Sequence, residues 1–273
     1  MVGSVLMMSL RSVHAGYGYQ YLLRSVATND AHTRGSSDKL SDYYQAKGTP
    51  PGRWLGGGLD CLASPHVMDG KVVEADQMLC LYGVGLHPDA HQFWAEGGSY
   101  SDALLGRAYR TFTNNIDVLN ALRDAEKDFR VANNRLPSEE ERSDLVVDVA
   151  RPFYQEATGF DHASGKDIVA WVNAQQRQVR QAVAGYDLTF SPVKSVSVLW
   201  ALADEHTANT IASLHHKAVA EALAWAEDNV IFTRRGNGGI EQAKTRGIIA
   251  SEFTHFDTRL GDPDLHSHVL VSN

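Results

Sequence analysis

The sequence has few features of secreted or membrane-spanning proteins. Among its 273 residues only Cys61 and Cys80 are cysteines and no C-x-x-C pattern occurs, which fits a reducing compartment and excludes a cysteine-based zinc motif. No apolar run approaches the roughly 20 residues that a membrane-crossing helix needs. The first eight residues lack the basic start and the cleavage site of a signal peptide. We therefore expect a cytoplasmic protein without a membrane segment.

An excess of basic residues is also absent. The chain has 33 acidic and 25 basic residues and a formal net charge of −8, whereas proteins that coat nucleic acid nonspecifically are usually basic. The acidic residues cluster at 124–148, while Arg234, Arg235, Lys244 and Arg246 precede the C-terminal segment. Because the location of charge matters more than its sum, the composition still permits local binding of DNA.

The C-terminal segment, 246–273, carries the most informative pattern. Residues 248–256 and 265–272 are rich in β-branched and apolar side chains and predict two strands. The residues between them include Gly, Asp and Pro, which are typical of a loop. This arrangement predicts a β-hairpin.

Three histidines lie on the predicted hairpin. Side chains alternate between the faces of a strand, so His266 and His268 share one face, and antiparallel pairing brings His255 opposite His266. An H-x-H pair alone is more often hydrogen-bonded or solvated than metal-binding, but a third histidine on a neighbouring strand favours a metal site. Three imidazoles suit a divalent transition metal and leave coordination positions open for a substrate oxygen.

These residues also carry a resemblance to a known family. His255, followed by D-P-D-L-H-S-H-V-L-V-S-N from Asp262, resembles the histidine triad of HUH endonucleases, specifically MobF (TrwC/TraI-like) conjugative relaxases and most closely the actinobacterial members. In that family the triad binds a divalent metal that polarises the scissile phosphate of single-stranded DNA, and a tyrosine near the N-terminus attacks it. The resemblance therefore implies a divalent metal cofactor, with Mg, Mn and Zn all open.

Two tyrosine clusters occupy the N-terminal region, as they do in relaxases. Tyr17, Tyr19 and Tyr21 alternate in the first, and Tyr43 and Tyr44 form the second. A single tyrosine is more often a structural residue with a hydrogen-bonded hydroxyl. The family pattern implies Tyr19 as the first nucleophile, with Tyr21 close behind it, and the second cluster for a later strand transfer. The spacing Y-G-Y-Q-Y departs from the adjacent tyrosines usual in the family, so the choice within the first cluster stays open.

A second motif lies at 184–200. It predicts a strand over 186–190, a cap at Ser191, a helix from Pro192, and a buried helix face with Val196, Leu199 and Trp200. Its D-L-T-F-S-P-V-K-S-V-S resembles the relaxase motif D-L-T-F-S-x-x-K-S-V-S. That match implies that Asp187 is the catalytic aspartate, acting as base or as the group that orients the nucleophile.

Basic side chains near these motifs are candidates for DNA binding. Lys194 lies in the first turn of the predicted helix, whose unpaired N–H groups favour a phosphate. Arg234 and Arg235 flank a Gly-rich turn, and Arg246 precedes the histidine hairpin. We predict that these four residues contact DNA.

The remaining segments predict an N-terminal strand over 8–13 and three helical regions. Within 73–95, a helix is expected to end at Gly83 and to be followed by a loop. Residues 117–180 are expected to form a helical layer in which a new helix starts with Ser138 as its cap. An amphipathic helix over 208–229 is expected to expose His215 and His216 and to bury one apolar face. That face comprises Ile211, Leu214, Ala218, Val219, Ala222 and Trp225.

The resemblance implies an α+β fold of the HUH-endonuclease type. An antiparallel sheet is expected to carry the histidines centrally, with helices on one face and a helical insertion at 100–180. Residues 1–273 would form one relaxase domain, followed by further sequence because family members continue past this strand.

The implied activity is site- and strand-specific nicking of single-stranded DNA with strand transfer through a 5′-phosphotyrosine, which initiates conjugative plasmid transfer. The expected partners are single-stranded DNA at an origin of transfer, auxiliary relaxosome proteins and a coupling protein. A rolling-circle replication initiator would share the chemistry. A non-catalytic metal-binding or single-strand-binding module would keep the histidines and lose the tyrosine reaction.

Overall fold

A computed structural model describes residues 7–16, 18–23, 50–106, 108–258 and 262–273. They fall into two compact units, one made of Met1–Asp89 with Val183–Asn273 and the other of Ala90–Ala182. Tyr17, Tyr43 and Tyr44 lie outside the described residues.

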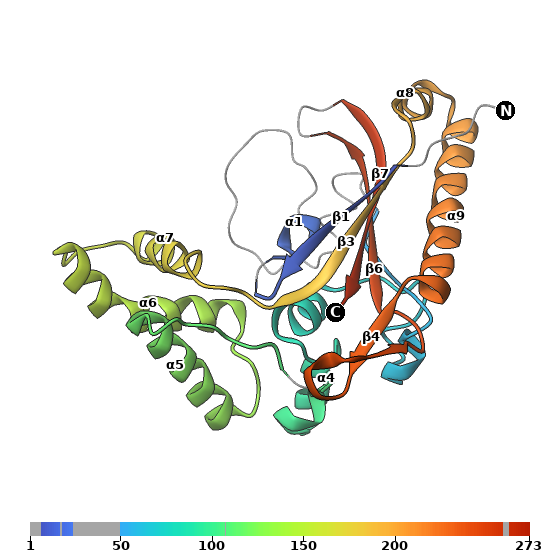
Figure 1. Ribbon diagram of the computed structural model, residues 1–273. Helices are drawn as coiled ribbons and strands as arrows, with labels where there is room; N and C mark the ends of the chain where they lie inside the picture. The colour runs from blue at the N-terminus through green and yellow to red at the C-terminus, as the bar shows by residue number, and fades with distance from the viewer. Residues whose placement is uncertain (1–6, 17, 24–49, 107, 259–261) are drawn as a thin grey trace. The chain divides into compact units, whose positions relative to one another are not determined.

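The first unit contains a five-stranded antiparallel sheet in the order β1-β3-β7-β6-β2 (Figure 1). Its strands are β1 (Met7–His14), β2 (Arg53–Leu55), β3 (Val183–Ser191), β6 (Ala250–Asp257) and β7 (Pro263–Ser272). The two histidine strands, β6 and β7, lie inside the sheet, and β7 occupies its centre. The predicted α+β class and the central histidine strands are therefore confirmed.

The strand register separates the two faces of the sheet. His255 pairs with His266, and His268 lies between Phe253 on one neighbouring strand and Thr189 on the other. Because cross-strand partners point to the same face, this face carries all three histidines. The residues that alternate with them on β7 point to the opposite face and belong to the core; they include Val269 and Val271.

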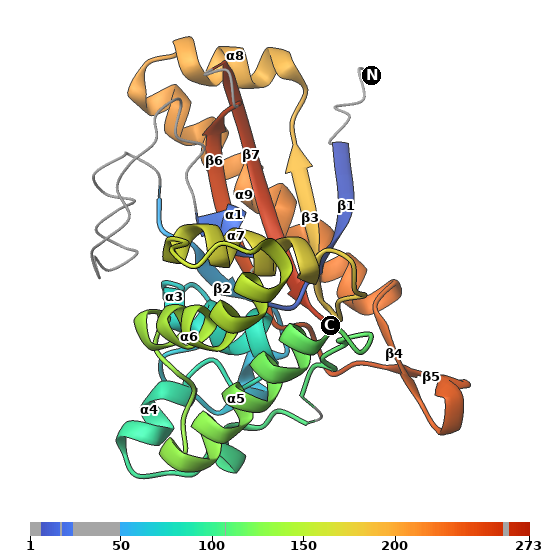
Figure 2. The same ribbon diagram turned by 90° about the vertical axis from the view of Figure 1, so that its left-hand side faces the viewer.

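The opposite face is covered by α9 (Glu205–Asn229), as Figures 1 and 2 show. The buried side of this helix is His215, Val219 and Leu223, spaced by four residues. Two expectations were therefore wrong: His215 is buried rather than on the surface, and the predicted core residues Leu214 and Trp225 are 61% and 62% exposed. Contact with the sheet decides which face of α9 is buried. The sequence does not identify this face, because apolar residues occur on more than one side of the helix.

The helix after β3 begins later than predicted. Ser191 still belongs to the strand, where it pairs with Met7 of β1, and α8 (Lys194–Leu202) starts after Val193. Pairing with the edge strand thus overrides the local helix-start signal. Leu199, predicted to be buried, is 55% exposed. Ser197 takes the buried position, and its hydroxyl oxygen accepts the backbone N–H of Leu265.

The segment around Gly83 also differs from its prediction. A short helix α3 (Ala75–Met78) continues as a π-helical turn η2 (Leu79–Val84), which ends at Gly85 with φ 79°. Gly83 is therefore inside the turn. The preceding 3₁₀ turn is η1 (Leu59–Leu62), and the short helix α1 (Gln20–Leu23) follows β1.

A two-stranded hairpin, β4 (Phe232–Arg235) and β5 (Glu241–Lys244), lies between α9 and β6 and encloses the turn η4 (Asn237–Gly239). It precedes the start of β6, whereas His255 lies near the end of that strand. Five residues of an extended strand span about 17 Å. The hairpin therefore lies toward the other end of the sheet from the histidines.

The second unit is helical. Its elements are α4 (Ala90–Ala95), η3 (Tyr100–Ala103), α5 (Asp117–Asn133), α6 (Glu139–Thr158) and α7 (Gly165–Gln176). Side chains of the last three helices share an apolar core. Ser138 caps α6 by accepting the N–H of Glu141 at 3.2 Å, which confirms the predicted helix start. None of the helices in the described part of the chain is long and apolar enough to cross a membrane.

Candidate metal and tyrosine site

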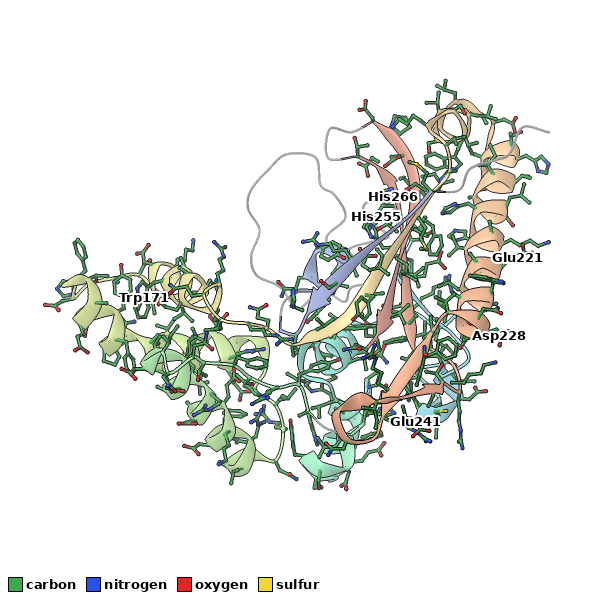
Figure 3. The ribbon with its side chains drawn as sticks, viewed as in Figure 1. Trp171, Glu221, Asp228, Glu241, His255 and His266 are labelled. Atoms are coloured by element: carbon green, nitrogen blue, oxygen red, sulfur yellow. The ribbon has the colours of Figure 1, made fainter. Side chains whose placement is uncertain are left out.

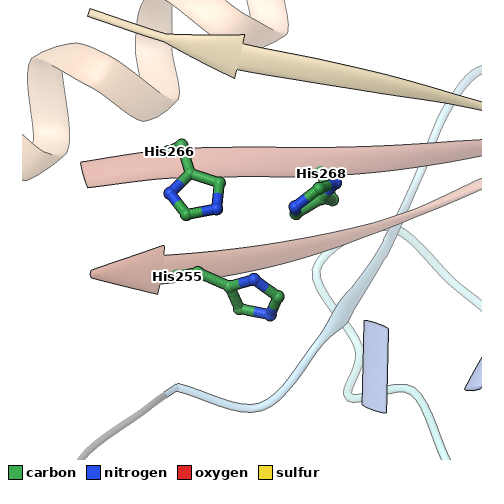
Figure 4. Close-up of side chains that lie close together, drawn as sticks. All are labelled: His255, His266 and His268. Carbon is green, nitrogen blue, oxygen red and sulfur yellow. The ribbon is translucent and has the colours of Figure 1, made fainter. Parts of the chain in front are cut away.

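Three imidazoles converge on one face of the sheet. One ring nitrogen from each of His255, His266 and His268 lies within 4.8 Å of the others, and the ring centroids are 5.1 to 5.4 Å apart (Figure 4). His255 comes from β6 and the other two from β7. The strand alternation seen in the sequence thus produces the predicted cluster.

Two of the rings are oriented by hydrogen bonds. His266 Nδ1 lies 2.7 Å from the carbonyl oxygen of Asp264, and His268 Nδ1 lies 2.8 Å from Asp187 Oδ2. Because carbonyl and carboxylate oxygens only accept, each Nδ1 carries the hydrogen and each Nε2 lone pair is free. Such bonds to the outer ring nitrogen are typical of metal-binding histidines.

His255 has no comparable hydrogen bond among the described residues. Both of its ring nitrogens are buried and lack a hydrogen bond of good geometry with any described residue. Burial, with smaller contributions from His268 and His266, lowers the pKa of His255 to about 3; the nearby Leu22 backbone partly opposes the shift. Burial also lowers the pKa of His266. Both rings are therefore neutral at pH 7.

This arrangement fits a divalent metal ion. Three ring nitrogens converge, two of the rings are fixed in the tautomer that directs Nε2 inward, and the buried nitrogens of the third ring form no hydrogen bond of good geometry with a described residue. A buried polar atom without a good hydrogen bond is costly, and a bound cation would satisfy it. Imidazole donors suit transition metals in particular.

A tyrosine lies next to this cluster. Tyr21 Oη donates a hydrogen bond of 2.5 Å to Asp187 Oδ2, and its ring contacts the His268 ring edge-on at 5.9 Å between centroids. Asp187 is 2% exposed. One carboxylate therefore connects the tyrosine hydroxyl to a histidine of the metal cluster.

The same contacts keep the tyrosine protonated. Burial raises the pKa of Tyr21, the hydrogen bond and negative charge of Asp187 raise it further, and the guanidinium of Arg11 acts in the opposite direction. The Tyr21 hydroxyl is consequently a hydrogen-bond donor at neutral pH, and Asp187 is positioned to accept its proton.

The structure brings together only some of the predicted catalytic residues. Tyr19 is 4% exposed, and the hydroxyl that reaches Asp187 belongs to Tyr21. Tyr43 and Tyr44 lie outside the described residues.

The predicted DNA-binding residues lie at two separate places. Lys194 is at the histidine hairpin, where its Nζ donates to the Pro263 carbonyl at 2.5 Å. Arg234 and Arg235 are exposed on β4, and Arg246 is exposed just after β5. Figure 3 shows Glu241 of β5 at the end of the unit away from His255 and His266. The three arginines are therefore near the histidines in sequence and not in space.

Two site residues were missed by sequence reasoning. Thr189 Oγ1 lies 3.1 Å from His268 Nδ1, and the Arg11 guanidinium lies 5.5 Å from the centroid of the Tyr21 ring. Thr189 follows Asp187 by two residues on a predicted strand, so alternation would have indicated it. No sequence pattern indicated Arg11, because its place next to Tyr21 depends on the pairing of β1 with β3.

Comparisons with known proteins agree with these motifs. The family model described as TrwC relaxase matches residues 15–273. The multifunctional conjugation protein TraI of Escherichia coli is 35% identical over 89 residues, and that of Escherichia coli strain K12 is 33% identical over 89 residues. Each match covers 33% of this chain and 5% of the relative, so the chain corresponds to a small part of these proteins.

Solved structures of conjugative relaxase TrwC are also similar. A copper-bound complex with oriT DNA has a TM-score of 0.46 and 20% identity, covering 98% of this chain and 57% of that one. A second metal-bound complex with oriT DNA has a TM-score of 0.43 and 19% identity, with the same coverage. The family itself is established by the sequence match over 15–273, which includes the tyrosines, Asp187 and all three histidines: the chain belongs to the TrwC relaxase family.

Proposed function

We propose that this chain is a metal-dependent transesterase that nicks single-stranded DNA and holds one end as a 5′-phosphotyrosine. The observation that carries the proposal is the connection Tyr21–Asp187–His268, in which one buried carboxylate accepts from both a tyrosine hydroxyl and a histidine of the metal cluster. This connection supports a site in which a nucleophile, a proton acceptor and a metal act next to one another.

The reaction conserves phosphodiester bond energy. Tyr21 Oη forms a bond to phosphorus while the bond from phosphorus to the 3′ oxygen breaks. Asp187 takes the tyrosine proton, and the departing 3′ oxygen takes a proton from water. A later attack by a 3′-hydroxyl reverses these steps and reseals the strand.

The three histidines hold the cofactor. His266 and His268 present Nε2 because their Nδ1 hydrogens are bound to Asp264 and Asp187, and His255 supplies a third nitrogen. When bound there, a divalent cation supplies positive charge to the nonbridging oxygens of the scissile phosphate. Burial lowers the pKa of His255 and His266, so neither proton competes with the cation at neutral pH.

Tyr21 is the better candidate for the first nucleophile than Tyr19. Its hydroxyl has a proton acceptor at 2.5 Å and its ring touches the histidine cluster, whereas Tyr19 is buried. Tyr43 and Tyr44 remain candidates for a second strand transfer.

The biological substrate follows from the family. We propose single-stranded DNA at an origin of transfer in the cytoplasm, with conjugative plasmid transfer as the process and auxiliary relaxosome proteins and a coupling protein as partners. Lys194 is the predicted basic residue nearest the histidines, so it is proposed to hold the strand there. Arg234, Arg235 and Arg246 would contact DNA farther along the sheet.

Covalent trapping on substrates of random sequence tests the proposal for any target site. A pool of single-stranded oligonucleotides with randomised sequence and a 3′ fluorophore is incubated with protein and Mg²⁺, Mn²⁺ or Zn²⁺. A 5′-phosphotyrosine leaves the labelled fragment on the protein through SDS electrophoresis. Sequencing of the adducted fragments and of the released 5′ fragments, compared with the input pool, identifies the preferred site, and mass spectrometry of the nucleotide-bearing peptide identifies the tyrosine.

We expect the adduct on Tyr21, its loss in Tyr21→Phe, and its retention in Tyr19→Phe. An adduct on Tyr19, or on a tyrosine of the second cluster, would contradict the choice of nucleophile and leave the reaction in place. Absence of any adduct from the wild-type protein with all three metals would contradict the proposed activity.

A further inference from the structure

Arg11 is the cation nearest the reacting tyrosine among the described contacts, and no motif accounts for it. It lies on β1, the edge strand, opposite Asp187 in the register with β3. Cross-strand partners share a face, so the Arg11 side chain lies on the face that carries Asp187 and the histidines. Its guanidinium carbon is 5.5 Å from the centroid of the Tyr21 ring.

Tyr21 is therefore contacted by both Arg11 and His268. The His268 ring meets the tyrosine edge-on at 5.9 Å, and Asp187 holds the tyrosine hydroxyl at 2.5 Å. The strands that carry Arg11 and His268 flank β3 on either side. Two interstrand spacings, about 10 Å, separate their backbones, a gap that a long arginine side chain and a phosphodiester together can span.

Arg11 forms no ion pair with a carboxylate among the described residues. The nearest candidate, Asp187, already accepts from Tyr21 and His268. Arg11 is exposed, so its planar set of N–H donors is accessible to an anion, and this set matches the oxygens of a phosphate.

We propose that Arg11 is a catalytic residue that binds a nonbridging oxygen of the phosphodiester attacked by Tyr21. The inference rests on the proposed function and adds a second phosphate-binding group, on the β1 side of the site, to the histidine cluster on β6 and β7. As the bond from Tyr21 Oη to phosphorus forms and the bond to the 3′ oxygen breaks, the guanidinium stabilises charge on the phosphoryl oxygens and keeps all its own protons. The ring contact also orients Tyr21 toward the same phosphate.

The test uses Arg11→Gln, Arg11→Lys and a matched control, Lys217→Gln, which removes an exposed cation from α9 on the other face of the sheet. The substrate is an intact oligonucleotide that contains the preferred site with the sequence on both sides of the scissile phosphate. We expect Arg11→Gln to lower kcat for adduct formation by about 10²-fold, the usual cost of one donor to a transition-state oxygen. Lysine should restore part of the rate, and Lys217→Gln should react like the wild type. Metal content should be the same in all three variants.

A substrate with a methylphosphonate at the scissile position distinguishes a direct contact from a structural effect. Replacing one nonbridging oxygen by methyl removes the atom that Arg11 is proposed to bind. In one of the two diastereomers, Arg11→Gln should therefore cause little further loss, as expected for two changes that remove the same interaction.

Equal losses on the normal substrate and on both diastereomers would overturn the proposal, as would wild-type kcat in Arg11→Gln. Neither outcome would affect the proposed nicking activity, which depends on whether the wild-type protein forms an adduct at all.

Discussion

Asp187 connects the two halves of the site because it accepts hydrogen bonds from two elements. Its carboxylate binds the Tyr21 hydroxyl, from α1, and His268 Nδ1, from β7. The first contact provides an acceptor for the tyrosine proton, and the second fixes the tautomer of a metal-binding ring. These contacts are the basis for proposing that one residue acts in both proton transfer and metal binding.

Replacing Asp187 by asparagine should separate these two roles. An amide keeps the size and one acceptor oxygen, but it cannot take the tyrosine proton. We predict that Asp187→Asn slows adduct formation by about 10² to 10⁴-fold, the usual contribution of a general base. The measurement is single-turnover adduct formation at saturating metal, because loss of a histidine's outer partner weakens metal affinity by about 10 to 100-fold.

Wild-type adduct formation in this variant, with metal bound, would remove Asp187 from the chemistry. A suitable comparison is Asp228→Asn, since Asp228 lies at the exposed end of α9 with only a long contact of 3.4 Å to Lys244. That variant should react like the wild type.

At the scale of elements, the side chains of β6 and β7 alternate between the two faces of the sheet, and each face has its own role. The histidines point to one face, while Ser267, between His266 and His268, points to the other and lies 3.1 Å from His215 Nε2 of α9. The strand that holds the metal ligands is thereby fixed from behind by a buried polar contact as well as by apolar packing. Burial lowers the pKa of His215 to about 4, so this contact uses a neutral imidazole at pH 7.

The turn between β1 and α1 leads directly into the helix that carries Tyr21. Gly16 N donates to the Gly83 carbonyl of η2 at 2.8 Å, which ties the start of the turn to the π-helical segment. A Cβ at Gly18 would lie 2.3 Å from the His14 carbonyl oxygen and 2.9 Å from the His14 nitrogen. The turn therefore requires glycine at position 18 because two backbone segments approach closely.

We predict that Gly18→Ala lowers the rate of adduct formation at least about tenfold, because the turn must open and move Tyr21 away from Asp187. Metal affinity should stay near the wild-type value, since the ligands lie on β6 and β7. Gly165→Ala is the matched control: its Cβ would be 3.4 Å from Val147 Cγ2, an ordinary contact, and it should react normally.

Calorimetric metal titration and single-turnover kinetics measure the two quantities. A Gly18→Ala protein that reacts at the wild-type rate would show that the turn does not position the nucleophile. Equal losses of metal affinity and rate would show instead that the whole site depends on this turn.

At the scale of the whole molecule, metal binding should be coupled to folding. The three ligands come from two strands and are separated by up to 13 positions along the chain, so they converge only in the folded state. A ligand that binds only the native state stabilises it by about 4 kcal/mol at a concentration 1,000 times Kd.

We predict that Mn²⁺ or Zn²⁺ at about 1,000 times Kd raises Tm by roughly 8 to 16 °C, because about 4 kcal/mol of stabilisation corresponds to about 2 to 4 °C per kcal/mol for a protein of this size. His266→Ala combined with His268→Ala should abolish the shift, whereas His162→Ala, an exposed histidine of the second unit, should retain it. Thermal unfolding with and without chelator measures the effect. A shift of full size in the double variant would place the stabilising metal elsewhere.

Much of the site could be predicted from the sequence because it depends on short-range geometry. Strand alternation alone puts His266 and His268 on one face, and a short hairpin loop limits which residue can lie opposite them. The cap at Ser138 is equally local. The motif around Asp187 predicted that this residue acts as a base or orients the nucleophile. The structure adds the two hydrogen bonds of its carboxylate, to Tyr21 and His268.

The remaining features were decided by contacts between distant segments. Tyr19 and Tyr21 are separated by one residue and have identical side chains, and the hydrogen bond that distinguishes Tyr21 is made to Asp187, 166 positions away. The pairing of β1 with β3 brings Arg11 to the site, and the sheet chooses the His215 face of α9 over that of Trp225. Local periodicity in the sequence was sufficient to predict that the three histidines share one face of the sheet. Only tertiary packing decided which tyrosine and which cation face the histidines, because those choices depend on close contacts between segments far apart in the chain.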